Sequence, residues 1–74
     1  MKKVYKMKEL DCANCAAKME RGISLIDGVK ACNVNFIMQK LTLEIDDGAD
    51  LSAVLAAVKA AVKRVDSDSE IIGL

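Results

Sequence analysis

The sequence contains no histidine, no proline and no tryptophan, and its aromatic residues are limited to Tyr5 and Phe36. A hydrophobic core in this chain must therefore be built mainly from aliphatic side chains. With no histidine and only three cysteines, the chain lacks the four ligands that a closed structural zinc site requires. The odd number of cysteines also rules out a framework in which every cysteine is paired within the chain.

An excess of charge of one sign and long apolar runs are also missing. Eleven lysine and arginine residues balance eleven aspartate and glutamate residues, whereas a nucleic-acid-binding surface needs an excess of basic side chains. No apolar stretch approaches the roughly 20 residues of a membrane-spanning helix, and Met1 is followed by lysines rather than by the apolar core of a signal peptide. We therefore expect no nucleic-acid binding, no membrane insertion and a cytoplasmic protein with reduced thiols.

What the sequence does contain is enough apolar material for one small folded unit. Hydrophobic residues make up 53% of the 74 residues, a fraction that is too high for a disordered chain. The length lies near the lower limit at which a single core is sufficient. We expect one domain that covers residues 1–74, without a linker, repeat or low-complexity segment.

Apolar periodicity predicts the elements in the first half of the chain. Alternation in residues 4–8 predicts a strand. A helix is expected from Cys15 to about Ile26, with Asn14 as its cap and Gly28 just beyond its end. The inward stripe of this helix would consist of Ala16, Met19, Ile23 and Ile26.

The second half of the chain repeats these patterns. Residues 31–36 and 41–45 alternate on either side of a short connection, so they predict a β-hairpin. A turn at residues 46–48 follows, and Asp50 is expected to cap a helix over residues 51–65. A polar loop then leads to a short strand over residues 70–74. The resulting βαββαβ order predicts an α+β, ferredoxin-like sandwich, in which a four-stranded antiparallel sheet carries both helices on one face.

Residues 10–20 read LDCANCAAKME and place two cysteines three positions apart. Cys12 falls in the loop after the first expected strand, and Cys15 falls in the first turn of the helix. Free backbone N–H groups and the helix dipole favour negative charge there, and so favour the thiolate that binds metal. The alternatives are two inert small residues or a thioredoxin-like redox pair, but the chain has none of the proline and tryptophan usual near such a pair.

The segment ELDCANCA, from Glu9 to Ala16, is similar to the pattern G-M-x-C-x-x-C-A of the heavy-metal-associated (HMA) domain family. The later segments LIDGV, VNF and KLTLEI also fit, so the chain resembles this family from Val4 to Leu74. The family comprises soluble metallochaperones and N-terminal modules of heavy-metal-transporting P-type ATPases. The resemblance implies that Cys12 and Cys15 are metal ligands, that Leu10 packs under the loop, and that the domain itself is not an enzyme.

Three residues of the motif depart from the copper-type pattern. Glu9 replaces the usual glycine, Leu10 replaces methionine, and Asp11 replaces threonine or serine. The form D-C-x-x-C resembles modules of zinc-, cadmium- and lead-exporting ATPases, in which the aspartate can join the cysteines as a ligand. Zn(II) and Cd(II) prefer three or four ligands and accept carboxylate oxygen, whereas two thiolates satisfy Cu(I). We expect Zn(II), Cd(II) or Pb(II) as cargo, held by Asp11, Cys12 and Cys15, with Cu(I) as the alternative.

The fourth ligand is not evident in the sequence, and such an open site suits delivery of a metal ion rather than its storage. We expect a monomer that docks to a cognate ATPase or to another domain of it, and exposed Lys18 and Arg21 could contact an acidic partner. Cys32 shares its parity with Val34 and Phe36, which predicts a small buried residue rather than a third thiol ligand.

Overall fold

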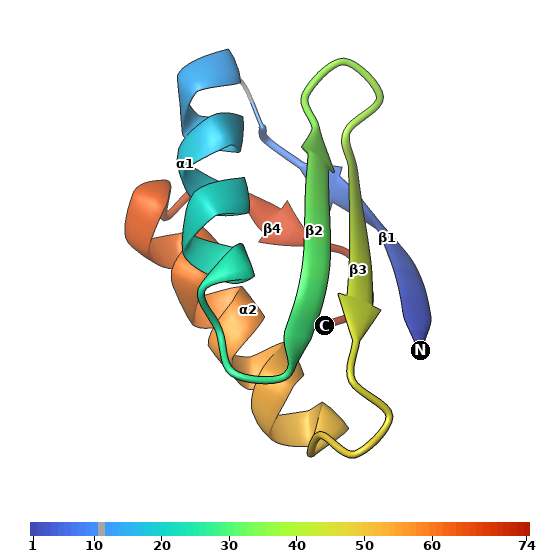
Figure 1. Ribbon diagram of the computed structural model, residues 1–74. Coiled ribbons are helices and arrows are strands. Elements are labelled where there is room, and N and C mark those ends of the chain that lie inside the picture. Colours follow the sequence, from blue (N-terminus) through green and yellow to red (C-terminus); the bar gives the residue numbers. More distant parts are fainter. Residues whose placement is uncertain (11) are drawn as a thin grey trace.

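The computed structural model describes residues 1–10 and 12–74. Its elements are β1 (Lys2–Lys8), α1 (Ala13–Ser24), β2 (Val29–Asn35), β3 (Lys40–Ile45), α2 (Leu51–Val65) and β4 (Glu70–Ile71). The predicted βαββαβ order and the α+β, ferredoxin-like class are therefore confirmed. Figure 1 shows both helices packed on one face of the sheet, with the start of α1 and the β2–β3 hairpin at the same end of the molecule.

The sheet has four strands in the order β2-β3-β1-β4, and each neighbouring pair is antiparallel. Strand β1 is thus central and has β3 on one side and β4 on the other. It pairs with β3 over Lys2–Lys6, and with β4 at Met7 and Lys8. The last residues of β1, which lead to the two cysteines, are therefore the part of the strand that β4 flanks.

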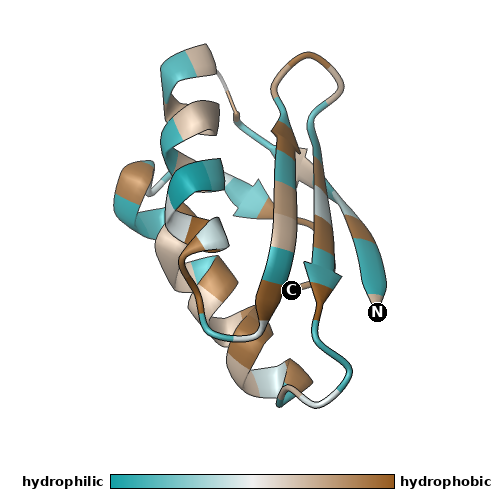
Figure 2. Ribbon diagram, viewed as in Figure 1, coloured by the Kyte–Doolittle hydropathy of each residue, from teal (hydrophilic) through white to brown (hydrophobic). Residues whose placement is uncertain are grey.

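The hydrophobic core lies between the sheet and the two helices. It consists of methionine, alanine and aliphatic side chains, as the lack of aromatic residues predicts, and Met19, Ile23, Leu41, Leu43 and Val58 are completely buried. Figure 2 shows the hydrophobic and hydrophilic bands that alternate along the strands. Because alternate residues of a strand point to opposite faces, this pattern directs one face of the sheet to the helices.

The two helices differ in how they begin. Helix α2 covers the predicted residues, and the carboxylate of Asp50 accepts a hydrogen bond from the N–H of Ala53 at 3.4 Å. Helix α1 begins two residues earlier than predicted, at Ala13. The prediction that Asn14 caps α1 is wrong, because Cys12 occupies the cap position with an extended backbone (φ −132°, ψ 123°).

Strand ends and one burial prediction also differ from the structure. Strand β2 ends at Asn35, so Phe36 begins the hairpin turn, and β4 ends at Ile71. Gly73 has a φ of 97°, a conformation that turns the chain away from the extended path of a strand. Cys32 is only half-buried, because β2 lies at the edge of the sheet. Over the described ranges, neither helix combines the length and apolar character needed to cross a membrane.

Candidate metal centre

Cys12 and Cys15 lie together at the start of α1. The carbonyl of Cys12 accepts the first helical hydrogen bond, from the N–H of Ala16 at 3.0 Å, and Cys15 belongs to the first turn. Both side chains are half-buried and free of disulfide bonds. The loop and the first turn therefore present two thiols that remain accessible from solvent.

The pKa values of the two thiols are shifted in opposite directions. The pKa of Cys12 is lowered, mainly because the backbone N–H of Cys15 and then the thiol of Cys15 favour a negative Cys12 sulfur. The pKa of Cys15 is raised, mainly because its thiol is hydrogen-bonded to Cys12, and further because it is partly withdrawn from water. The hydrogen bond between the two thiols thus favours loss of a proton from Cys12 before Cys15, and a metal ion that binds both sulfurs must displace the proton of Cys15 as well.

Charged side chains near the pair act in opposite directions. Asp66, just after α2, contributes to the raised pKa of Cys15, whereas the positive charge of Lys18 favours the thiolate of either cysteine. The carboxylate of Asp66 adds negative charge at the end of the molecule where the sulfurs lie. Such charge favours a cation and favours a divalent ion more than a monovalent one.

Asp11, the third predicted ligand, lies outside the described residues. Within residues 1–10 and 12–74, no three histidine, cysteine, aspartate or glutamate side chains come together to hold a metal ion. Cys32 lies on β2 opposite Leu43, and its pKa is raised to about 12, chiefly by burial and further by the charge of Glu20. The structure thus brings Cys12 and Cys15 together and places Cys32 on a strand.

Two residues that the sequence analysis did not single out contact the backbone that leads into the cysteine loop. The side chain of Gln39, in the β2–β3 turn, bonds to Leu10. The hydroxyl of Ser69, just before β4, bonds to the carbonyl of Glu9. Neither contact has a signal in the sequence, because glutamine in a turn and serine in a polar loop are common and most often make no such long-range contact.

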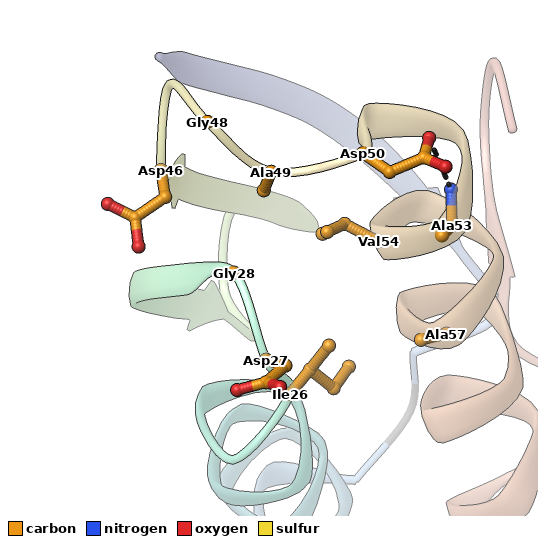
Figure 3. A pocket seen from close by; sticks show the side chains of 10 residues that line it. All are labelled: Ile26, Asp27, Gly28, Asp46, Gly48, Ala49, Asp50, Ala53, Val54 and Ala57. Carbon is orange, nitrogen blue, oxygen red and sulfur yellow. Dashed lines mark hydrogen bonds between the residues drawn. The ribbon is translucent and has the colours of Figure 1, made fainter.

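A hollow at the other end of the molecule lies away from the two cysteines. It is a groove of about 700 Å³, bordered by residues 26–28, residues 46–50 and the first turns of α2. In Figure 3 the side chains of Ile26 and Val54 point toward each other across it, and Asp50 is engaged in capping α2. The groove lies just beyond the C-terminal end of α1, and the 12 residues of this helix span about 18 Å. It is therefore separate from the two thiols.

The described residues form a small ferredoxin-like α+β domain with an accessible dithiol at the start of its first helix, an arrangement suited to binding a metal ion. The family model of the heavy-metal-associated domain matches residues 4–64. The chain therefore belongs to the heavy-metal-associated domain family, and the resemblance inferred from its motif is confirmed.

Several metal-transporting ATPases contain a segment that is similar to this chain. The chain is 39% identical over 66 residues to the cadmium, zinc and cobalt-transporting ATPase of Bacillus subtilis, a match that covers 89% of this chain and 9% of that protein. It is 35% identical over 52 residues to the copper-transporting ATPase 2 of Rhizobium meliloti, which covers 70% of this chain and 6% of that protein. The chain thus spans less than a tenth of the length of these relatives.

Solved structures share the same fold. The CopZ metallochaperone superposes with a TM-score of 0.74 at 20% identity, over 97% of this chain and 100% of that one. The N-terminal domain of a potential copper-translocating P-type ATPase from Bacillus subtilis, in the Cu(I)-loaded state, gives a TM-score of 0.72 at 27% identity. That match covers 95% of this chain and 81% of the other.

Proposed function

We propose that this domain binds a soft divalent metal ion, Zn(II), Cd(II) or Pb(II), through Cys12, Cys15 and Asp11, and passes it to a partner. The observation that carries the proposal is the meeting of the two thiols at the start of α1, where one sulfur already favours its thiolate. Thiolates are the form in which cysteine binds these metals. Membership of a heavy-metal-associated family supports the assignment.

The choice of a divalent ion is supported by charge and by sequence similarity. Two thiolates and the Asp11 carboxylate would neutralise a divalent ion and leave one negative charge, and Asp66 adds a further carboxylate nearby. A relative with 39% identity over 89% of this chain is a cadmium, zinc and cobalt-transporting ATPase. The carboxylate would contribute little to Cu(I), which two sulfurs satisfy.

Delivery rather than storage follows from the incomplete ligand set. Three protein ligands leave a coordination position that water or a donor from the recipient can fill, so the ion can move by ligand exchange. The recipient would be the membrane transporter to which the domain belongs or docks, on the cytoplasmic side. In this role the domain binds and presents the metal ion and catalyses no reaction.

Cu(I) transport is the second candidate. It is favoured by the 27% identity to an ATPase domain whose structure is Cu(I)-loaded, and by the 35% identity to a copper-transporting ATPase. Cu(I) needs only the two sulfurs, which the described residues supply. The two candidates therefore differ in what they require of Asp11.

Zinc titration of three serine variants tests the binding site. Cys12→Ser and Cys15→Ser should each abolish tight binding, because one thiolate cannot hold the ion alone. Cys32→Ser is the matched control, which should keep binding but lose about 1–3 kcal/mol of stability through a partly buried hydroxyl. Loss of zinc binding in the Cys32 variant to the same degree would contradict the proposed ligand pair.

The ratio of metal affinities tests the role of Asp11. Asp11→Ala should lower the Zn(II) affinity about tenfold or more, equivalent to about 1.4 kcal/mol, while the Cu(I) affinity changes less. Competition with a chelator for each metal, on the wild type and the variant, measures both affinities. Equal losses for the two metals, or no loss for zinc, would mean that Asp11 is only a structural acid, and the Cu(I) candidate would then have equal standing.

A further inference from the structure

We propose that Gln39 and Ser69 are positioning residues of the metal centre, which hold the backbone of Glu9 and Leu10 so that the cysteine loop starts from a fixed point. This inference rests on the proposed function of the loop. Strand β1 lies between β3 and β4. Gln39 directly precedes β3 and Ser69 directly precedes β4, so the two residues reach this backbone from opposite sides. We refer to the pair as the brace.

Gln39 binds Leu10 in the way that a neighbouring strand would. Its Oε1 accepts a hydrogen bond from the N–H of Leu10 at 3.1 Å, and its Nε2 donates to the carbonyl of Leu10 at 2.6 Å. The second Nε2 proton goes to the carbonyl of Phe36 at 2.8 Å. An amide is the side-chain group that provides a donor and an acceptor in one plane. Gln39 thereby continues the β1–β3 ladder beyond its end at the Lys6–Lys40 pair.

Ser69 holds the adjacent residue from the other side. Its side chain is fully buried, and its hydroxyl lies 3.0 Å from the carbonyl of Glu9 and 3.3 Å from Oδ2 of Asp66. A buried hydroxyl without a partner costs free energy, so such groups are nearly always bonded. Ser69 is the buried polar side chain among the described residues, and the carbonyl it meets belongs to the segment that carries the site.

The conformation of Glu9 explains why the segment needs such support. Its φ is 59°, in the left-handed region, where a residue with a Cβ atom is disfavoured because the Cβ approaches the following carbonyl oxygen. A conformation of this kind persists where surrounding contacts hold it. The brace supplies contacts on both sides, and Leu10 is 1% exposed in the core below. The two cysteines that follow stay accessible.

The physical consequence is a binding site ordered before the metal arrives. A loop that is free at its entry must lose conformational entropy when both sulfurs engage one ion, and that cost is subtracted from the affinity. Fixing Glu9 and Leu10 removes part of the cost in advance. Removal of the brace should therefore weaken metal binding in a protein that remains folded.

The test compares Gln39→Met, which removes three side-chain hydrogen bonds at similar size, with Asn35→Ala as the matched control. Asn35 lies in the same hairpin, accepts a hydrogen bond from the N–H of Met38 at 2.9 Å and has no bond to Glu9 or Leu10. Cd(II) affinity is measured by chelator competition, and the Cd(II)–thiolate absorption band and thermal unfolding are recorded on the same samples. Ser69→Ala tests the contribution of Ser69 to the brace, and Ser67→Ala, at an exposed residue, is its control.

We expect Gln39→Met and Ser69→Ala each to weaken Cd(II) binding about tenfold and to speed amide exchange at Leu10. Asn35→Ala and Ser67→Ala should leave the affinity within about twofold, even where they lower the unfolding temperature. Unchanged Cd(II) affinity in both brace variants, or equal losses in the controls, would overturn the inference. If Gln39→Met does not fold, Ser69→Ala and Gln39→Glu, which keeps the acceptor oxygen, decide the question.

Failure of this inference is distinguishable from failure of the proposed function. If the wild type binds Cd(II) no better than Cys12→Ser, the dithiol is not the metal site and the proposed function fails. Amide exchange at Leu10 in the metal-free protein still measures whether the brace holds the loop. If the wild type binds tightly and the brace variants bind equally well, the function stands and the brace is only a part of the scaffold.

Discussion

The three cysteines of this chain occupy three chemically different environments. Cys12 gains from the N–H groups at the start of α1, and its pKa is lowered. The thiol of Cys15 is hydrogen-bonded to Cys12 and partly withdrawn from water, and its pKa is raised. Cys32 is half-buried on β2 and packs against the core, where burial and then the charge of Glu20 raise its pKa to about 12. Reactivity toward metal or alkylating reagents at neutral pH should therefore begin at Cys12.

Cys32 should make the folded protein less stable as the pH becomes alkaline. An unfolded chain releases the Cys32 proton near the ordinary pKa of 9.0, whereas the folded protein retains it up to about 12. The unfolded state binds fewer protons than the folded state between these two pKa values. The contribution of Cys32 to the free energy of unfolding is therefore fully present below this pH range and falls as the pH rises through it. The loss is at most about 1.4 kcal/mol per pH unit.

Chemical denaturation from about pH 8 to about pH 11, on the wild type and on Cys32→Val, isolates this effect. The wild type should lose stability relative to the variant above the ordinary thiol pKa, and the two should run in parallel below it. A constant difference across the range would mean that Cys32 ionises in the folded protein as it does in the unfolded chain.

Among the elements, α2 was predicted to the residue and α1 was not. Asp50 has a carboxylate that accepts from the N–H of Ala53, and such oxygen caps are readable in a sequence. At α1 the cap position is occupied by Cys12, whose side chain forms no cap hydrogen bond. Because sequence rules for helix caps look for side-chain oxygen acceptors, they favour Asn14 instead. The cysteine motif itself was readable because both members lie within one local segment.

The parts of the site that could not be predicted are those made by residues distant in sequence. Gln39 lies 29 positions from Leu10 and Ser69 lies 60 positions from Glu9, and only the folded sheet brings them together. The half-burial of Cys32 has a similar origin. Alternation identifies the face of a strand, but the position of β2 at the edge of the sheet depends on strand order.

The turn between α1 and β2 should be sensitive to an added methyl group. Gly28 has a φ of 94°, and a Cβ there would lie 2.9 Å from Cβ of Ala49 and 2.9 Å from Cγ2 of Val54. Gly28→Ala should therefore cost about 2 kcal/mol or more, from backbone strain and overpacking together. Urea denaturation measures the change.

Gly22→Ala is the control for this substitution. Gly22 lies within α1, and nothing lies within 4 Å of an added Cβ. Because alanine favours a helix by up to about 1 kcal/mol over glycine, Gly22→Ala should be neutral or stabilising. Equal destabilisation by the two substitutions would contradict the close packing at Gly28.

At the scale of the whole molecule, the metal centre and the core are separate. The buried side chains belong to both helices, to β1, β3 and β4, and to adjoining loops, whereas the two thiols of the CxxC motif lie at the surface. We expect the reduced, metal-free protein to unfold cooperatively on heating, unlike a zinc finger. Zn(II) should add stability only through binding, about 2.7 kcal/mol at a free concentration one hundred times the Kd.

Calorimetry of the reduced protein with a chelator, and then with Zn(II), checks this expectation. A metal-free sample without a transition, or an amide spectrum that becomes dispersed only when zinc is added, would show that the metal substitutes for part of the core. The Cys12→Ser variant should unfold like the metal-free wild type in both conditions.

The contact between Ser69 and Glu9 has a consequence for the order of events during synthesis. A ribosome completes Cys12 and Cys15 early, but it must add 54 more residues after Cys15 to reach Ser69, which takes about 3–11 s at 5–20 residues per second. Throughout that interval the nascent chain carries both thiols without the second half of the brace. The cysteine loop can therefore be held by both Gln39 and Ser69 only when almost the whole domain has left the exit tunnel. Translation thus delays the moment at which the nascent chain has an ordered metal site.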